Sequence, residues 1–324
     1  MGMLSYATLI NVRKICIIGG SGFVGAHLIN HLYKEGHQMR LLTRHPSHCK
    51  HLYVLTELLD IRKVDVIHDP AELARQFMGM DAVINLTGIL HEHEPGEFER
   101  VHVELARNVV DACRVAGVHR LLHMSALGAS PDGLSKYQQS KGRGEALVRA
   151  AHDDDLQVTI FRPSVIFGCG DRFLTLFGKL LKWAPLFPLG SAHARFKPIA
   201  VNDVARAIGI SLNKRATYGN TYDLCGPQVY TLQQLVEHVA SVLGLKRLVV
   251  PLGDGLSYLQ AWAMELLPMK MLTRDNYLSL KSDAICPGPF PEVFGFAPTS
   301  LEAEAPLCLG VMPSHHPRDT ALTS

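Results

Sequence analysis

The chain of 324 residues has little net charge and no long apolar segment. Its formal charge is +2, and no run of lysine and arginine is suited to a nucleic-acid backbone. Apolar stretches such as "LSYLQAWAMELLP" are shorter than the roughly 20 residues that a transmembrane helix needs. The first residues, "MGMLSYATLINVRK", also lack the pattern of a secretory signal. These absences argue against nucleic acid and a membrane span, and they predict a cytoplasmic protein that is at most peripheral to the inner membrane.

Closely spaced cysteines are also missing. The seven cysteines are odd in number and dispersed, and no two form a C-x-x-C pair. The sequence therefore predicts reduced thiols in place of disulfides or a metal cluster. His91 and His93 in "LHEHEPGE" have no third ligand at a suitable spacing, so no metal is expected there. The composition, 47% apolar and 19% charged, is that of a globular protein.

What the chain does contain is an alternation of short apolar runs and longer amphipathic ones, which is typical of βα units. The expected strands are "KICII", "QMRLLT", "KVDVI", "DAVINLT", "HRLLHMS" and "LQVTIFR". The expected helices span about 22–35, 70–78, 97–116 and 136–151. Because each strand is a nearly continuous apolar run, it should be buried on both faces. We therefore predict an α/β fold with a Rossmann-type, doubly wound parallel sheet.

The first expected strand runs into "IGGSGFVG", which places three glycines at the start of a helix. Gly19 permits a tight turn, Gly22 allows a diphosphate to approach, and Gly25 allows the helix to pack closely on the strand. This context predicts a dinucleotide site. Residues 41–50, "LLTRHPSHCK", contain no acid for the ribose 2′-hydroxyl of NAD, whereas Arg44 suits the 2′-phosphate of NADP. NADP(H) is therefore preferred, and NAD(H) remains an alternative.

The domain organisation follows from a weaker alternation downstream of the sixth strand. Residues 1–165 are expected to form the NAD(P)-binding domain, which residues 196–224 complete with a further strand, helix and strand. Residues 166–195 and 225–300 are expected to form a smaller cap over the substrate. The tail, 301–324, is expected to be disordered.

Two Y-x-x-x-K pairs occur, Tyr137 with Lys141 and Tyr277 with Lys281, and their contexts differ. Ser125 stands twelve residues before Tyr137, at the end of the fifth expected strand, where ligands bind in such sheets. No comparable strand precedes Tyr277. Tyr137 and Lys141 emerge on one helix face. A nearby ammonium, together with the positive ring of an oxidised nicotinamide, would lower the pKa of the phenol and suit it to proton transfer. This pair is therefore predicted to be catalytic, with Ser125 holding the substrate oxygen.

The order of the segments "GGSGFVG", "NLTG", "LLHMSALGA", "YQQSK" and "FRPSVIFG" resembles the extended and atypical short-chain dehydrogenase/reductase superfamily, which includes NAD-dependent epimerases and dehydratases. From about Lys14 to Leu301 the chain looks most like bacterial relatives of the NADPH-binding accessory subunit of respiratory complex I. The resemblance implies the catalytic set Ser125, Tyr137 and Lys141. The cofactor site that it implies consists of Gly19, Ser21, Gly22, Phe23, Val24, Gly25, Arg44, Asp65, Val66, Leu86, Thr87, Gly88, Tyr137, Lys141, Arg162 and Pro163.

Within this resemblance, adenine would lie near Asp65 and Val66, and the nicotinamide near Arg162 and Pro163. "VDVIHDPAEL" carries one residue more than the usual spacing, so Asp65 and Asp69 compete for the adenine. His102 occupies a helix position that is often Asn in extended members. One apolar stretch is expected to be cap core in preference to a partner-facing surface; it contains Trp262, Met264, Met269 and Met271.

Two functions from different classes remain open. In the first, the protein is an NADP(H)-dependent oxidoreductase or epimerase that acts on a hydroxyl or ketone, with Tyr137 as acid and base. In the second, NADPH is mainly a structural ligand of an accessory or assembly subunit in a membrane-associated respiratory complex. The presence of Ser125, Tyr137 and Lys141 favours the enzyme, because a structural nucleotide needs no activated phenol. The apolar cap favours a hydrophobic substrate, such as a quinone or a lipid, or a protein partner.

Overall fold

The computed structural model describes residues 12–65, 70–266 and 272–309. Its centre is a seven-stranded sheet in the order β11-β6-β5-β4-β1-β2-β3, in which every neighbouring pair is parallel. The strands are β1 (Lys14–Ile18), β2 (Gln38–Thr43), β3 (Leu59–Lys63), β4 (Ala82–Asn85), β5 (Arg120–Met124), β6 (Gln157–Pro163) and β11 (Thr221–Leu224). The strand order reverses between β1 and β4, which confirms the predicted doubly wound, Rossmann-type α/β fold.

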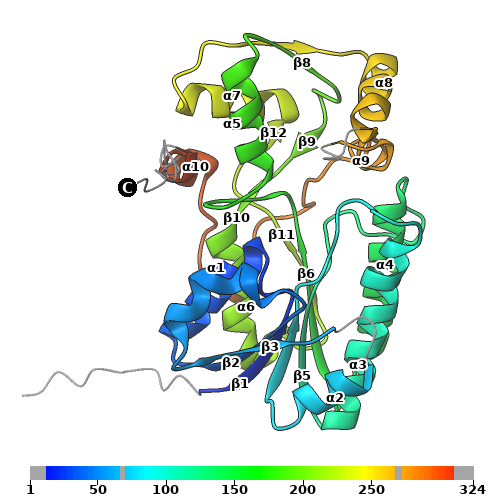
Figure 1. Cartoon of the computed structure of the whole chain (residues 1–324), viewed down its shortest axis with the longest axis vertical. Helices are drawn as coiled ribbons and strands as arrows, with labels where there is room; N and C mark the ends of the chain where they lie inside the picture. The colour runs from blue at the N-terminus through cyan, green and yellow to red at the C-terminus, as the bar shows by residue number, and fades with distance from the viewer. Residues whose placement is uncertain (1–11, 66–69, 267–271, 310–324) are drawn as a thin grey trace, which may run out of the picture.

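Helices cover both faces of this sheet (Figure 1). One face carries α1 (Phe23–Lys34) and α6 (Val201–Asn213), and the other carries α2 (Pro70–Phe77), α3 (Leu105–Ala116) and α4 (Lys136–Ala150). The side chains of β1 alternate between the two layers, as the pleat of a strand requires. Ile15 and Ile17 join the core on the α1 side, whereas Cys16 and Ile18 join the core on the α3 side. The continuous apolar run of β1 is therefore explained by burial on both faces.

The third strand lies earlier in the chain than expected. β3 spans Leu59–Lys63, whereas the predicted run "KVDVI" begins where β3 ends and continues into residues outside the described part. β3 is the edge strand of the sheet, and only Leu59 is buried, while Arg62 and Lys63 are exposed. An edge strand of this kind has no continuous apolar run. The search for such a run therefore predicted the more apolar segment that follows β3. The 3₁₀-helical segment η1 (Pro46–Leu55) precedes it.

A second group of elements lies beyond the carboxyl ends of the strands, at the top of Figure 1. The helices are α5 (Phe173–Trp183), α7 (Leu232–Val242), α8 (Asp254–Glu265), α9 (Arg274–Ser279) and α10 (Leu301–Leu309), with the short turns η3 (Arg215–Thr217) and η4 (Glu292–Phe294) elsewhere in the chain. The paired strands are β7 (Ile166–Phe167) with β10 (Ile199–Ala200), β9 (Arg195–Phe196) with β12 (Tyr230–Thr231), and β8 (Leu186–Leu189) with β13 (Leu248–Pro251). Leu181, Phe196 and Leu235 belong to a separate apolar core, which we call the cap core.

Residues 301–309 form helix α10, so the prediction of a disordered tail is wrong for this segment. Leu301, Ala305 and Leu309 are buried at intervals of four residues, which places them on one helix face against the cap core. The run "LEAEAPLCL" hides this pattern, because an internal Pro306 and two glutamates suggest a break in structure. Residues 310–324 lie outside the described part.

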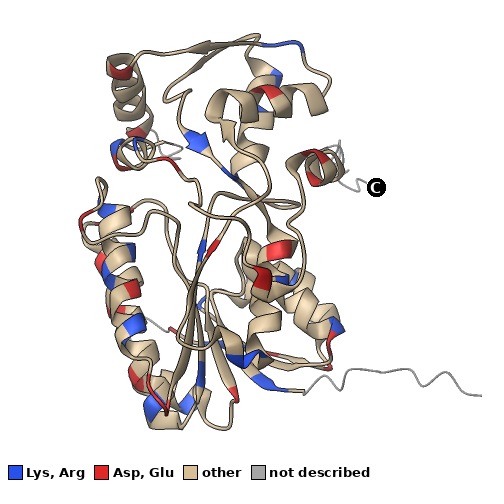
Figure 2. Cartoon of the chain, turned by 180° about the vertical axis from the view of Figure 1, so that it is seen from behind, with Lys and Arg blue, Asp and Glu red and all other residues tan. Residues whose placement is uncertain are grey.

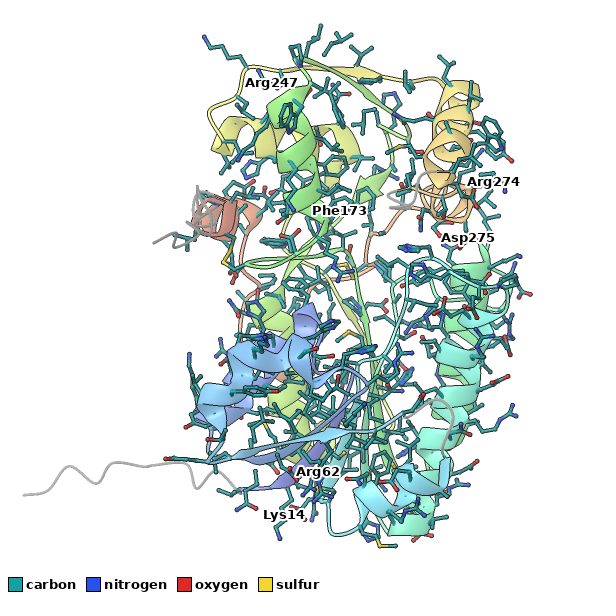
Figure 3. The ribbon with its side chains drawn as sticks, viewed as in Figure 1. Lys14, Arg62, Phe173, Arg247, Arg274 and Asp275 are labelled. Carbon is teal, nitrogen blue, oxygen red and sulfur yellow. A yellow bond between two sulfur atoms is a disulfide. The ribbon has the colours of Figure 1, made fainter. Side chains whose placement is uncertain are left out.

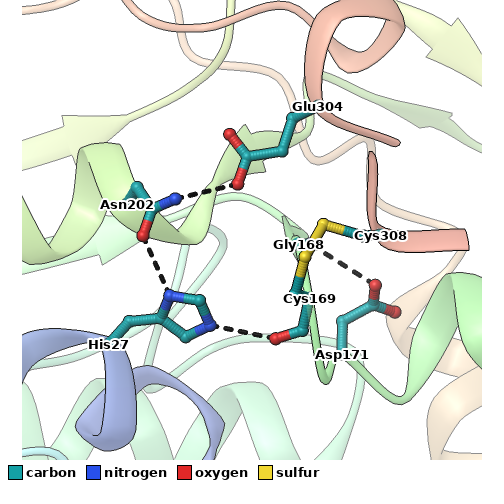
Figure 4. The surroundings of a disulfide bond; sticks show 7 residues. All are labelled: His27, Gly168, Cys169, Asp171, Asn202, Glu304 and Cys308. Carbon is teal, nitrogen blue, oxygen red and sulfur yellow. Dashed lines mark hydrogen bonds between the residues drawn. A yellow bond between two sulfur atoms is a disulfide. The ribbon is translucent and has the colours of Figure 1, made fainter. Parts of the chain in front are cut away.

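Two disulfides are present, so the prediction of reduced thiols is wrong for four cysteines. Cys169 is bonded to Cys308, and Cys225 is bonded to Cys286, whereas the other three cysteines are free and buried. The partners are 139 and 61 residues apart in the sequence, so no short motif could reveal them. Figure 4 shows the first disulfide, which ties α10 to the loop that follows β7.

The apolar stretch expected to be cap core is not part of it where the structure describes it, because neither Trp262 nor Met264 belongs to the cap core. Trp262 is 45% exposed and Met264 is half-buried, while Met269 and Met271 lie outside the described residues. No helix among the described residues is long and apolar enough to cross a membrane. Acidic and basic residues are mixed along α4 (Figure 2), in keeping with the small net charge.

Candidate functional site

The glycine-rich turn connects β1 to α1 at the carboxyl edge of the sheet. Gly19 has a φ of 78°, a conformation that glycine adopts more readily than other residues. A Cβ on Gly25 would lie 2.3 Å from the Cα of Gly20, and a Cβ on Gly20 would lie 2.6 Å from the Cδ1 of Leu41. The turn is therefore packed so closely that a side chain at Gly20 or Gly25 would clash. The role of Gly20 was missed by the sequence analysis, although the G-G pair marks it.

The N-terminus of α1 is open to an anion. Gly22 is the N-cap, so no side chain caps the helix, and the first turn contains no acidic residue. The first amide groups of the helix, those of Phe23, Val24 and Gly25, have no acceptor within it, and the helix dipole adds partial positive charge there. Ser21 lies half-buried in the turn itself. These residues fit the diphosphate of a dinucleotide.

Arg44 follows β2 directly and is exposed at the same edge as the glycine turn, because β1 and β2 are adjacent parallel strands. The ion pairs among the described residues do not include Arg44. Asp65 is exposed just beyond β3, and Val66 and Asp69 lie outside the described residues. The assignments of a 2′-phosphate to Arg44 and of adenine to Asp65 and Val66 therefore remain predictions.

Leu86, Thr87 and Gly88 follow β4, and their loop adjoins the glycine turn. A Cβ on Gly19 would lie 3.0 Å from the carbonyl carbon of Leu86 and 3.0 Å from the amide nitrogen of Thr87. Asn85 shapes the loop, because its Oδ1 accepts hydrogen bonds from the Thr87 amide at 3.1 Å and from the Thr87 hydroxyl at 2.5 Å. The structure thus brings together two loops that the sequence analysis assigned to one cofactor.

Tyr137 lies in the first turn of α4, where Ser135 forms a capping box. Its ring is half-buried between Phe98 and His102, at centroid distances of 6.0 and 5.7 Å. Its hydroxyl makes no hydrogen bond to another described residue, although its backbone is hydrogen bonded. Burial raises the pKa of Tyr137 to about 12. The side chains of the protein alone therefore do not lower this pKa, and the phenol is protonated at neutral pH.

Lys141 is one helical turn further along α4 and is only 5% exposed. Its Nζ donates a hydrogen bond to the carbonyl of Met124 at 2.8 Å, at the end of β5. The same nitrogen is 3.9 Å from the position that a Cβ on Gly88 would occupy. Burial lowers the pKa of Lys141 to about 8, against the opposing effect of Glu145. The amine therefore lies beside the loop after β4, and the Met124 carbonyl at the end of β5 accepts its hydrogen bond.

Ser125, predicted to hold the substrate oxygen, is hydrogen bonded within the protein. Its hydroxyl donates a hydrogen bond to Glu145 Oε2 at 2.6 Å, and the residue is buried. Glu145 also accepts hydrogen bonds from Arg162, with Nε at 2.7 Å and Nη2 at 2.6 Å, and one from Arg149. A buried carboxylate needs such donors to compensate for lost hydration. Ser125 and Arg162 are thereby held on one acidic side chain.

Glu145 is a residue of this site that the sequence analysis missed. Its signal was position, because Tyr137, Lys141 and Glu145 follow at intervals of four and so share one helix face. The pKa of Arg162 is raised by its hydrogen bond to Glu145. Pro163 ends β6 and its carbonyl accepts a hydrogen bond from the backbone of the loop after β5. The contact of Arg162 and Pro163 with a nicotinamide remains a prediction.

His102 connects the loop after β4 to α4. It lies in the π-helical segment η2 (Glu99–Glu104), and such turns are frequent at functional sites. Its Nε2 accepts a hydrogen bond from the Ile89 amide at 3.1 Å, so Nδ1 carries the proton and donates it to Ser140 Oγ at 2.8 Å. Burial lowers the pKa of His102 to about 2, which keeps the ring neutral. From the sequence, His102 was expected only to replace a common Asn, and its contacts were not predicted.

The second Y-x-x-x-K pair joins two cap helices. The Tyr277 hydroxyl donates a hydrogen bond to Asp254 Oδ1 at 2.5 Å, and Lys281 Nζ lies 3.1 Å from Asp254 Oδ2. A cavity of about 350 Å³ adjoins these residues, and a second of about 650 Å³ lies at the amino edge of the sheet, near Lys14 and Asp60. Neither cavity is lined by the glycine turn or by α4. The structure thus gives Tyr277 and Lys281 a packing role.

Comparison with known proteins places this geometry in a family. Residues 15–225 match the model of the NAD dependent epimerase/dehydratase family. The chain is 29% identical over 304 residues to NADH dehydrogenase (ubiquinone) 1 alpha subcomplex subunit 9, mitochondrial, of Mus musculus, and the match covers 89% of this chain and 78% of that protein. The chain spans less than two thirds of the length of other relatives of that name.

Two further proteins are similar to this chain, one in sequence and the other in fold. The chain is 30% identical over 243 residues to ceramide reductase of Caulobacter vibrioides, which covers 74% of each protein. The solved structure of a nucleoside-diphosphate-sugar epimerase from Staphylococcus aureus aligns with a TM-score of 0.71 over 89% of this chain and 98% of that chain, and at 18% identity it shows the shared fold. NAD(P) is the typical cofactor of such proteins, and the glycine turn fits it. The chain belongs to the NAD dependent epimerase/dehydratase family.

Proposed function

We propose that the protein is an NADP(H)-dependent oxidoreductase in which Tyr137 is the acid and base. The proposal is carried by the Tyr137 hydroxyl, which has no hydrogen-bond partner among the described residues. The buried Tyr277 pairs its hydroxyl with Asp254, as a tyrosine with a structural role normally does. The half-buried Tyr137 instead leaves its hydroxyl open to a ligand. An unpaired phenol at the ligand-binding edge of the sheet is suited to bind a substrate oxygen.

The pKa of the Tyr137 phenol suits it to donate a proton to a ketone. With a pKa of about 12, the Tyr137 phenol is protonated at neutral pH and donates its proton to a ketone oxygen. NADPH, when bound, supplies the hydride that the carbonyl carbon receives. With a pKa of about 8, Lys141 is largely charged at neutral pH and stabilises the phenolate that remains on Tyr137. The Ser125 hydroxyl donates its hydrogen bond to Glu145, so the hydrogen bond to a ketone oxygen comes from Tyr137.

The substrate that we expect is mainly apolar. Two cap arginines have acidic partners, since Arg195 is 2.6 Å from Asp283 and Arg274 is 2.8 Å from Glu265, so neither is free for a sugar diphosphate. The cap core contributes a chain of ring contacts formed by Phe173, Phe177, Phe187 and Phe196. Figure 3 places Phe173 at the end of α5 nearer the sheet. The relative named ceramide reductase supports a lipid-like ketone or alcohol.

The test is turnover by the native protein and by Tyr137→Phe with NADPH and a panel of ketones, quinones and nucleotide sugars. Tyr277→Phe is the matched control, because it removes the hydroxyl of the second Y-x-x-x-K pair. We expect turnover of an apolar ketone or quinone, its loss in Tyr137→Phe by about 10²-fold or more, and its retention in Tyr277→Phe. Equal activity of the native protein and Tyr137→Phe would refute the role of the phenol.

A second function is favoured by the exposed surface of α8. Leu256, Leu259, Trp262 and Leu266 follow at intervals of three or four and are all substantially exposed. Such a stripe is typical of an interaction surface, and it supports an accessory subunit that holds NADPH at a respiratory complex beside the inner membrane. This function predicts NADPH that copurifies and exchanges slowly, no turnover, and coisolation with a membrane complex that charged substitutions in the stripe abolish.

A further inference from the structure

Cap helix α9 meets the first turn of α4 through one carboxylate. Asp275 Oδ1 accepts a hydrogen bond from the Lys136 amide at 2.7 Å, and Oδ2 accepts one from the Tyr137 amide at 3.1 Å. The next amide, that of Gln138, is bound by the Ser135 hydroxyl at 3.1 Å. All three amides at the start of α4 are therefore occupied, and the two that include Tyr137 are held from the cap.

α9 also contacts the opposite wall of the candidate site. Asn276 Nδ2 donates a hydrogen bond to the Leu90 carbonyl at 2.9 Å, in the loop that follows Gly88. Ser279 Oγ donates one to Ser135 Oγ at 2.7 Å. The helix thus bridges the loop after β4 and the N-terminus of α4, and Figure 3 shows Asp275 at the junction of α9 and α4.

The bond to Tyr137 is of a strong kind. Amides in the first turn of a helix have no acceptor within it, and a carboxylate there gains from both the charge and the helix dipole. Because one of the two amides belongs to Tyr137, the position of Asp275 sets the position of the backbone that carries the phenol. Asp275 lies 139 residues after Lys136 in the chain and belongs to cap helix α9, so a shift of α9 changes the first turn of α4.

We propose that Asp275 is a positioning residue through which the cap sets the Tyr137 phenol. The inference rests on the proposed function and links the position of the cap to the proton donor. A substrate that moves the cap helix α9 orients the Tyr137 phenol through the two Asp275 hydrogen bonds. A residue that merely capped α4 would stabilise the helix without affecting the phenol.

The first experiment needs no substrate. A fluorotyrosine is placed at position 137, and its fluorine NMR resonance is recorded in the native protein, in Asp275→Asn and in Asp283→Asn. The amide of Asn retains the shape of Asp275 but removes one acceptor and the charge. Asp283 is the matched control, because it bonds Arg195 within the cap. We expect a shifted or broadened resonance in Asp275→Asn and an unchanged one in Asp283→Asn; an unchanged resonance in both overturns the proposal.

The second experiment measures the reduction of phenanthrenequinone by NADPH. We expect Asp275→Asn to lower kcat by about tenfold or more with no change in KM for NADPH, because misplacement of a reacting group costs rate and not cofactor binding. In a Tyr137→Phe background the same substitution should cause no further loss. Equal losses in both backgrounds overturn the proposal. Absence of turnover in the native protein refutes the proposed function alone, and the resonance then decides the inference.

Discussion

The buried charge of Lys141 is expected to lower the free energy of unfolding of the protein. The side chain is 5% exposed, and burial lowers its pKa from 10.5 to about 8, so folding works against its charged form. We predict that Lys141→Met raises the thermal stability of the protein while it removes a residue of the candidate site. Such a trade between stability and function is common where a site holds a buried charge.

The magnitude follows from the pKa and from the contacts that are lost. A pKa difference of about 2.5 corresponds to about 3 kcal/mol of unfavourable free energy at neutral pH. Loss of the hydrogen bond to the Met124 carbonyl costs about 1 kcal/mol. Glu145 is not left without a partner, because Arg162 still donates two hydrogen bonds to it. The net gain is about 2 kcal/mol, or roughly 4 °C in Tm.

The pH dependence of the stability difference distinguishes the removal of a buried charge from better packing of the methionine. Below pH 8 the lysine is protonated in both states, so the native protein bears the full cost. Between pH 8 and 10.5 only the unfolded state holds the proton, so the stability of the native protein rises with pH relative to the variant. The difference in Tm between Lys141→Met and the native protein should therefore narrow across this interval.

Calorimetry of both proteins from about pH 7 to about pH 10 provides the measurement. Lys281→Met is the matched control, because Lys281 is exposed and its pair with Asp254 lies at the surface; its stability should change by less than about 1 kcal/mol. The reasoning is refuted if Lys141→Met is less stable than the native protein at neutral pH, or if the difference does not depend on pH.

Three other predictions concern the glycine turn, the cofactor and the disulfides. Gly25→Ala should lower Tm and weaken NADPH binding, because its Cβ would lie 2.3 Å from the Cα of Gly20; unchanged Tm and affinity would contradict the close packing. Arg44→Ser should weaken NADPH binding by about tenfold and leave NADH binding unchanged, as measured by titration calorimetry; equal effects on both would exclude a 2′-phosphate contact. Alkylation of the denatured, unreduced protein should label three of seven cysteines, and reduction should lower Tm, since each disulfide contributes up to about 4 kcal/mol; seven labelled cysteines would show that neither disulfide forms.

Local pattern was sufficient for the inner strands of the sheet and for the glycine turn. The run "KICII" predicts β1, because a strand buried on both faces must be apolar at every position. Gly19 and Gly25 are recognisable because their roles involve residues only a few positions away in the chain. The side chains of Tyr137, Lys141 and Glu145 share a helix face for the same reason, since their spacing alone determines it.

Only the tertiary structure decided which groups meet these side chains. In the folded protein the Ser125 hydroxyl donates a hydrogen bond to Glu145, and the Tyr137 amide donates one to Asp275. Cysteines 139 and 61 residues apart form the two disulfides. The tertiary structure also placed β3 at an edge, where a mixed sequence suffices. The physical reason is that these contacts form between distant parts of the chain after long loops have closed, so their partners leave no periodic trace in the sequence. Side-chain chemistry was readable from local spacing, but its electrostatic environment depended on the fold.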